Sequence, residues 1–117
     1  MNKARKDVQL GIFVHHIYEL KRGLRGLVLY KADKFLKRKI ENRLKREKMA
    51  FIVYSLGESH INVFFGNVLC VEVVKRINKE HLNDYTAEED FMLGIMLGYG
   101  LIPQIERFLN YKKKHKE

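Results

Sequence analysis

Apolar residues recur at helical spacing near the start of the chain. Phe13, Ile17 and Leu20 stand at i, i+4 and i+7, which places their side chains on one face of a helix. Gly23 follows them, and glycine is common just past a helix C-terminus because it tolerates a positive φ. The pattern predicts a short helix over residues 12–22.

A second stripe with the same spacing consists of Leu36, Ile40 and Leu44. Asp33 precedes it, and an aspartate side chain can accept hydrogen bonds from the free amides of a first helical turn. The pattern predicts an amphipathic helix from Asp33 to Lys48. The face opposite the stripe is basic and carries Lys34, Lys37, Arg38, Lys45, Arg46 and Lys48.

Three segments have the composition of strands. Residues 25–30 end in four consecutive apolar positions, which is typical of a central strand covered on both faces. Residues 50–56 and 61–65 are separated only by a short polar turn at 57–59, so they are expected to form a hairpin.

The chain after the hairpin is expected to be helical. Residues 68–81 are rich in valine, which favours strands, but their apolar positions recur at helical spacing and we predict a helix. Thr86 and Glu89 have the spacing of a capping box, in which each side chain bonds the other's backbone amide. A longer helix is therefore expected from Ala87.

That last helix contains residues that interrupt helices. Gly98 and Gly100 weaken it, and Pro103 has no amide hydrogen to donate. The chain should therefore leave helical geometry between Gly98 and Pro103 and resume in a last piece that ends near Lys112.

The predicted order is α-β-α-β-β-α-α, in a single α+β domain spanning residues 1–117. We expect a three-stranded mixed sheet with helices packed on it, because a β-α-β unit precedes the hairpin. Residues 1–8 and 112–117 are expected to be loose basic tails. The expected core consists of Leu27, Leu29, Leu36, Ile40, Ile52, Val63, Phe65 and Phe91.

The net charge is +9, and it is unevenly distributed along the 117 residues. Residues 1–48 hold 15 basic and 5 acidic residues, whereas residues 49–106 hold 3 basic and 8 acidic residues. A basic surface attracts nucleic acid or an acidic protein. A surface rich in solvated lysines, without any partner, is the alternative interpretation, since 15 of the 23 basic residues are lysine.

Several function classes lack their sequence signatures. Cys70 is the single cysteine, which excludes an internal disulfide and a multi-cysteine metal site. His15 and His16 are adjacent, so on a helix they point about 100° apart and do not form a metal pair. No glycine-rich phosphate loop is present. We expect a cytoplasmic protein with no cofactor, no metal and no membrane span.

Polar residues that could converge on one pocket form a second candidate site. Arginine suits carboxylate or phosphate groups because its guanidinium offers a planar fork of donors. These residues could bind an anion or planar ligand, or could form structural ion pairs and caps instead. They are His16, Arg22, Arg25, Asn62, Glu89 and Asp90.

Three segments together resemble a known family. They are residues 15–25 (HHIYELKRGLR), 61–66 (INVFFG) and 88–100 (EEDFMLGIMLGYG), followed by Gln104 and residues 106–108. The set, in this order, resembles the small bacterial family catalogued as domain of unknown function 2023 over residues 14–110. The resemblance implies a compact α/β domain without an assigned activity, often encoded beside a flavodoxin. Gly100 and Pro103 depart from the family pattern, which has an acidic residue at the first position.

Three functions remain open from the sequence. The first is a non-enzymatic module that binds an acidic protein, such as a flavodoxin, through the basic face formed by Lys37, Arg38, Lys45 and Arg46. The second is a nucleic-acid-binding domain that uses the same face, with strand aromatics for stacking. The third is a ligand-binding protein or enzyme that uses His16, Arg25 and Asn62. The spacing of Gly94 and Gly98 indicates close approach of another element and leaves a homodimer open.

Overall fold

The computed structural model describes residues 3–114 as one α+β domain. The helices are α1 (Lys3–Lys21), α2 (Lys37–Arg46), α3 (Val68–Ile77), α4 (Ala87–Met96) and α5 (Leu101–Lys114), and the strands are β1 (Leu27–Asp33), β2 (Ala50–Leu56) and β3 (His60–Gly66). Short 3-10 turns, η1 (Lys34–Leu36) and η2 (Leu82–Asp84), precede α2 and α4. The predicted order is confirmed, with the last helical region divided into α4 and α5.

The sheet has the order β1-β3-β2, and both pairings are antiparallel. The prediction of a mixed sheet was wrong, because the returning hairpin strand β3 lies between β1 and β2 and separates the two strands that run in parallel. The expectation that β1 is central was wrong for the same reason. β1 is nevertheless apolar on both faces, because helices cover both sides of the sheet.

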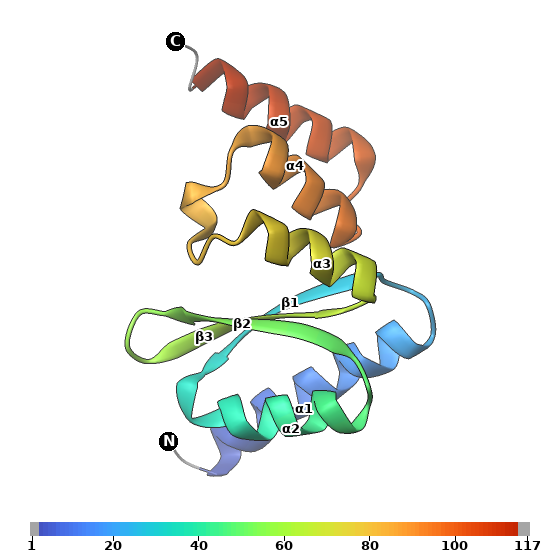
Figure 1. The fold of residues 1–117 in the computed structure, drawn as a ribbon, viewed down its shortest axis with the longest axis vertical. Coiled ribbons are helices and arrows are strands. Elements are labelled where there is room, and N and C mark those ends of the chain that lie inside the picture. The colour runs from blue at the N-terminus through green and yellow to red at the C-terminus, as the bar shows by residue number, and fades with distance from the viewer. Residues whose placement is uncertain (1–2, 115–117) are drawn as a thin grey trace.

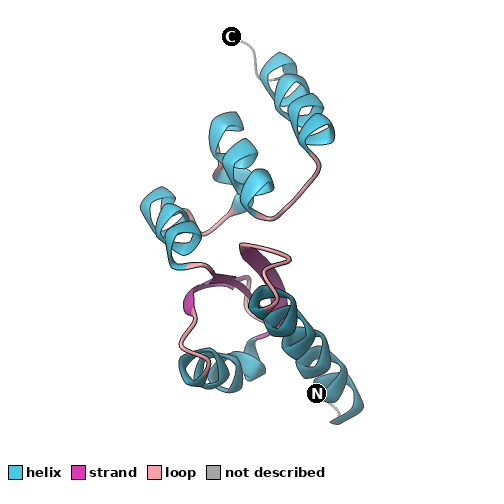
Figure 2. Cartoon of the chain, turned by 90° about the vertical axis from the view of Figure 1, so that its right-hand side faces the viewer, coloured by secondary structure: helices cyan, strands magenta, loops and turns pink. Residues whose placement is uncertain are grey.

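Two hydrophobic cores lie on opposite faces of the sheet. Alternate residues of β3 divide between them, since Val63 and Phe65 face α1 and α2 whereas Phe64 faces α3. Figure 1 shows α1 and α2 below the sheet and α3 above it, with α4 and α5 stacked beyond α3. Figure 2, turned by 90°, shows α5 farthest from the sheet.

The first helix is longer than the sequence pattern predicted. Residues 3–8, expected as a loose tail, form the first turns of α1. Contacts with Asp33 of β1 hold this part of the helix. Arg5 donates to the Asp33 carboxylate at 3.1 Å. Gln9 also donates to that carboxylate and accepts from the Asp33 backbone amide. At the other end, Lys112–Lys114 belong to α5, and the rest of the expected C-terminal tail lies outside the described residues.

Asp33 does not cap α2 as expected. Its backbone is extended and its side chain makes no cap hydrogen bond, because the carboxylate already contacts Arg5, Gln9 and His60. The chain therefore enters α2 through the η1 turn. The helix predicted over residues 33–48 is α2 with this turn in front of it.

The local signals of the second half are confirmed. Thr86 and Glu89 form the capping box of α4, and Asn67 caps α3 by accepting from the Leu69 amide. Gly98 has a φ of +87° and separates α4 from α5, as expected. The break is shorter than predicted, because Pro103 lies in the first turn of α5, where a missing amide hydrogen costs no helical hydrogen bond. Phe91 was expected in the core but is only half-buried, because it packs against Phe108 of α5, away from the sheet. Leu29 and Ile52 are also only partly buried.

Candidate functional site

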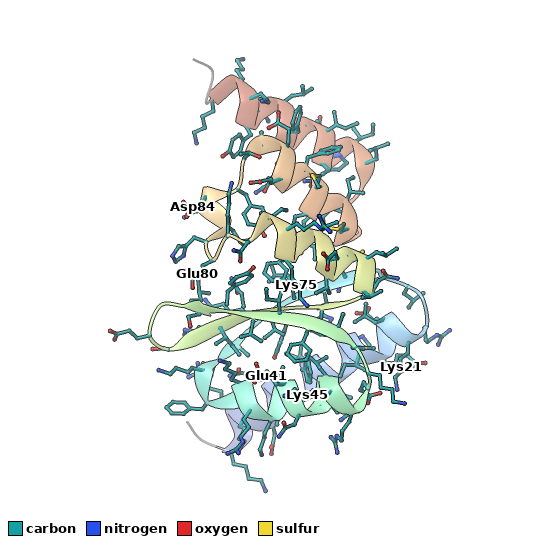
Figure 3. The ribbon with its side chains drawn as sticks, viewed as in Figure 1. Lys21, Glu41, Lys45, Lys75, Glu80 and Asp84 are labelled. Atoms are coloured by element: carbon teal, nitrogen blue, oxygen red, sulfur yellow. The ribbon has the colours of Figure 1, made fainter. Side chains whose placement is uncertain are left out.

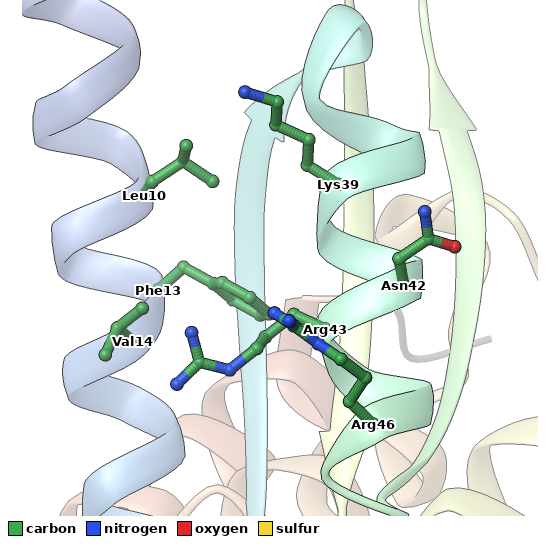
Figure 4. A pocket seen from close by; sticks show the side chains of 7 residues that line it. All are labelled: Leu10, Phe13, Val14, Lys39, Asn42, Arg43 and Arg46. Atoms are coloured by element: carbon green, nitrogen blue, oxygen red, sulfur yellow. The ribbon is translucent and has the colours of Figure 1, made fainter.

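A groove of about 650 Å³ lies between α1 and α2, the two helices that cover one face of the sheet. Figure 4 shows its two walls: Leu10, Phe13 and Val14 come from α1, whereas Lys39, Asn42, Arg43 and Arg46 come from α2. One wall is therefore apolar and the other is cationic and polar. A groove of this kind suits a ligand that carries both apolar and anionic groups.

The position of each wall follows from how the two helices pack. On α2, Ile40 and Leu44 are fully buried against the sheet. Lys39 and Arg43 stand at i and i+4, and Arg46 completes the turn, so these side chains form a row beside the buried stripe and face α1. On α1, Phe13 is fixed by ring contacts with Tyr30 and Phe65, at centroid distances of 6.0 and 5.3 Å.

Positive charge is concentrated at this groove. Lys6 lies within hydrogen-bonding reach of Lys39, and this proximity lowers the pKa of the Lys39 ammonium. Arg43 is held by Glu47, with Nε 2.8 Å from a carboxylate oxygen, and Glu47 also pairs with Lys21. Within residues 3–114, no carboxylate forms a salt bridge with Lys39 or Arg46, and the nearby Asp7 only partly offsets the effect of Lys6 on the Lys39 pKa. An anionic group bound here would relieve the repulsion between Lys6 and Lys39.

The basic face expected from the sequence only partly coincides with this groove. Lys37, Arg38, Lys45 and Arg46 are all exposed on α2, but only Arg46 lines the groove. Figure 3 shows Lys45 on α2, on the opposite side of the sheet from Glu80 and Asp84 near η2. Lys39 and Arg43 were missed, although their spacing of four residues beside the Ile40 stripe was a signal for them.

Two residues of the expected polar pocket come together, around Glu19 of α1. The Glu19 carboxylate lies 3.3 Å from His16 Nδ1 and 3.6 Å from Arg25 Nη1. The hydrogen bond with His16 is the main cause that lowers the pKa of Glu19. Arg25 also approaches the Leu97 carbonyl, at 3.4 Å, and so links the end of α1 to the end of α4. Arg22 instead donates to the Tyr18 hydroxyl, at 2.8 Å.

The remaining three residues of that set lie elsewhere. Asn62 is buried in β3 between Lys31 and Tyr54 of its neighbouring strands. Glu89 is occupied by the capping box and by Lys79, at 2.6 Å. Asp90 accepts two hydrogen bonds from Arg107, at 2.7 and 3.0 Å. The six residues therefore do not form one pocket, and those on α4 have structural partners.

A charged cluster that the sequence did not reveal lies at the end of β1. Asp33 contacts Arg5 and Gln9 of α1 and lies 3.2 Å from His60 Nε2 of β3. The hydrogen bond from Gln9 is the main cause that lowers the pKa of Asp33. Through Arg5 and Gln9, this cluster attaches the N-terminal half of α1 to β1. Because Gln9 directly precedes Leu10, the cluster also fixes the apolar wall of the groove.

Neither metal nor thiol chemistry has support in the described residues. Across residues 3–114, no three His, Cys, Asp or Glu side chains are arranged to hold a metal ion. Cys70 is half-buried against the α3 core, and burial raises the pKa of its thiol, which disfavours the reactive thiolate. Phe64, Phe65 and Tyr54 are buried, so the sheet offers no aromatic platform for stacking bases.

Comparison with known proteins identifies one family. A family model described as protein of unknown function (DUF2023) matches residues 11–111, so the chain belongs to this family. The match includes every residue that lines the groove except Leu10. No curated protein matches the chain. In residues 3–114, none of the helices has the length and apolar character required to cross a membrane.

Proposed function

We propose that this member of the DUF2023 family is a non-enzymatic binding module whose α1–α2 groove receives an acidic segment of a partner protein. The observation that carries the proposal is the pairing of an apolar wall, Leu10 and Val14 above Phe13, with a row of cations on α2. The proposal assigns no reaction to the chain and supposes that it acts in the cytoplasm.

The charges of the groove determine the type of partner. Lys39 and Arg46 form no salt bridge with a carboxylate of the described residues, and Lys39 is close to Lys6, with only Asp7 nearby to offset it. Carboxylates of a partner would supply the missing counter-charges, and desolvation by the apolar wall would strengthen those contacts. Long-range attraction by a chain of net charge +9 would also speed association with an acidic protein.

A flavodoxin is the partner that we test first, since the family resemblance implies that members are often encoded beside one. Nucleic acid is the alternative partner for the same cations. An apolar wall contributes little to binding a phosphate backbone, whereas it contributes directly to binding a protein segment. The groove therefore favours the protein partner.

The test compares two charge-matched variants of the full chain. Lys39→Glu with Arg46→Glu reverses the groove, and Lys75→Glu with Lys113→Glu reverses two exposed lysines on α3 and α5. Binding to a purified acidic flavodoxin, and to a 20-nucleotide DNA duplex, is measured at 50 and 200 mM salt. The groove variant should lose at least about tenfold in flavodoxin affinity, and the control variant should retain it.

Other results would contradict the proposal. Equal losses in both variants would show that overall charge, and not the groove, causes binding. Tighter binding to the duplex than to any acidic protein, including those captured from a nuclease-treated cytosol, would favour the nucleic-acid function.

The outer basic side chains of α2 provide a second test. Reversal of Lys37, Arg38 and Lys45 to Glu should change the free energy of unfolding by no more than about 0.5 kcal/mol, because all three are exposed. It should slow association with the partner while leaving the dissociation rate nearly unchanged, because these residues lie outside the groove. Stopped-flow binding separates the two rates, and an unchanged association rate would mean that this face is only solvated surface.

A further inference from the structure

An uncovered apolar surface lies on the three helices of the second half, at the opposite end of the molecule from the groove (Figure 1). Two hollows adjoin there and share Phe91 and Met92. One, of about 520 Å³, lies between α4 and α5 and is bounded by Ile105, Phe108 and Leu109. The other, of about 340 Å³, lies between α3 and α4 and is bounded by Val73, Ile95 and Met96. We call the combined surface the α3–α5 face.

Large apolar side chains on this face are exposed. The exposed fractions are 43% for Met92, 42% for Ile95 and 58% for Leu109. The apolar rows extend beyond the hollows, since Leu69 lies one turn before Val73 on α3 and is 72% exposed. Contiguous apolar surface of this kind on a folded chain marks an interaction site.

The charges of the three helices nearly cancel, because α3 carries a net charge of +1, α4 of −3 and α5 of +3. Glu88 pairs with Lys112 at 2.6 Å, and Glu72 pairs with Arg76 at 3.0 Å. These helices therefore offer a charged partner little net complementary charge, in contrast with the α1–α2 groove. A second copy of this chain carries +9 and would be repelled from the basic end, but it can approach the neutral α3–α5 face.

The size of the face is of the same order as such an interface requires. The three helices have 10 to 14 residues, which makes each about 15–21 Å long at 1.5 Å per residue. Packed about 8–10 Å apart, they offer a footprint on the order of 500 Å². A standard interface takes about 800 Å² of accessible surface from each partner, and projecting side chains make accessible surface larger than the footprint.

We propose that two copies of this chain form a two-fold symmetric dimer through the α3–α5 face, with Met92, Ile95 and Leu109 of each copy buried against the other. In such an arrangement the same apolar patch is used by both copies. Because α1 and α2 lie at the other end of the molecule, the dimer leaves both grooves open (Figure 1). This proposal does not depend on what the grooves bind.

The test is the mass of the full chain in solution. Sedimentation equilibrium from 1 to 200 µM, at 150 mM salt, should show a reversible monomer–dimer equilibrium. Ile95→Glu should raise the dimer dissociation constant by at least about 100-fold, because two carboxylates would be buried without partners. Circular dichroism should show unchanged helix content, since Ile95 is exposed in the single chain. Phe35→Glu is the matched control: Phe35 is 81% exposed but lies in η1, on the other side of the sheet, and the dimer should persist.

A wild-type chain that remains monomeric at 200 µM would overturn the proposal. So would an Ile95→Glu variant that is folded and still dimeric, or a Phe35→Glu variant that is folded and monomeric. If Ile95→Glu fails to fold, Leu109→Glu on α5 repeats the test from the other hollow. None of these outcomes involves the groove ligands, so they are independent of the experiment proposed for flavodoxin.

Discussion

The helices at the two ends of the molecule bury their apolar faces to different depths. α1 and α2 both lie directly on the sheet, and Phe13, Ile40 and Leu44 are at most 1% exposed. α5 packs against α4 instead, and Phe91 and Phe108 between them are only half-buried. The same helical spacing of apolar residues thus leads to full burial only where a second apolar layer lies beneath the helix.

Charge follows the same division. The α1–α2 end has cations without carboxylate partners among the described residues and a closed apolar core, whereas the α3–α5 end has paired charges and open apolar surface. The first combination suits a charged ligand and the second suits an apolar one. One small domain can therefore carry two surfaces of different chemistry at opposite ends.

The largest expected effect comes from a pair of phenylalanine truncations. Phe13→Ala should lower the free energy of unfolding by about 3–5 kcal/mol, because the ring is fully buried and contacts two other rings. Phe91→Ala should cost only about 1–2 kcal/mol, because the ring is half-buried and packs against Phe108 of α5, away from the sheet. Urea denaturation of both variants, monitored by circular dichroism and carried out below the dimer concentration range, measures the difference. Equal losses would show that the two ends are equally well packed.

A smaller effect is expected where α5 meets α4. Gly94 and Gln104 are in close contact, and a Cβ added at Gly94 would lie 2.1 Å from the Gln104 amide nitrogen. Gly94→Ala should therefore displace the buried Gln104 side chain, break its hydrogen bond to the Asp90 carbonyl, and cost about 1–2 kcal/mol.

Combining Gly94→Ala with Gln104→Ala gives the control for that contact. The double variant should be less destabilised than the sum of the two single variants, because the clash is gone. Strict additivity of the three unfolding free energies would show that the two residues do not meet.

The smallest effect concerns pH and the attachment of α1. The pKa of Asp33 is lower in the folded chain than its ordinary value of 3.8, chiefly because Gln9 donates to it. Its contribution to stability is therefore fully present above about pH 5 and is lost as the pH falls through the folded pKa. The protection factors of the amides in residues 3–12, which are corrected for the intrinsic pH dependence of exchange, should fall over that range before those in β3 do.

Asp33→Asn is the control for this prediction. The variant should show faster exchange in the same residues at pH 7 and a weaker pH dependence below pH 5, because its side chain does not titrate. If exchange in wild-type α1 is insensitive to pH down to 3, the Asp33 contacts do not hold the helix.

The sequence alone determined the features that depend on neighbours a few residues apart. The Leu36–Leu44 stripe predicted α2, Thr86 and Glu89 predicted the start of α4, and Gly98 predicted the break before α5. Each of these signals involves groups within about one or two helical turns, where spacing along the chain fixes spacing in three dimensions.

The tertiary structure decided what distant segments do when they meet. Three features join residues that are 24 or more positions apart: the pairing of β3 with β1, the attachment of α1 through Asp33, and the groove formed by Val14 and Lys39. A helical pattern shows which face of a segment is apolar but not which partner covers it. The same holds for the polar residues that the sequence grouped together. His16 and Arg25 approach each other at 3.5 Å, whereas Glu89 is occupied by its cap and by Lys79, far from α1.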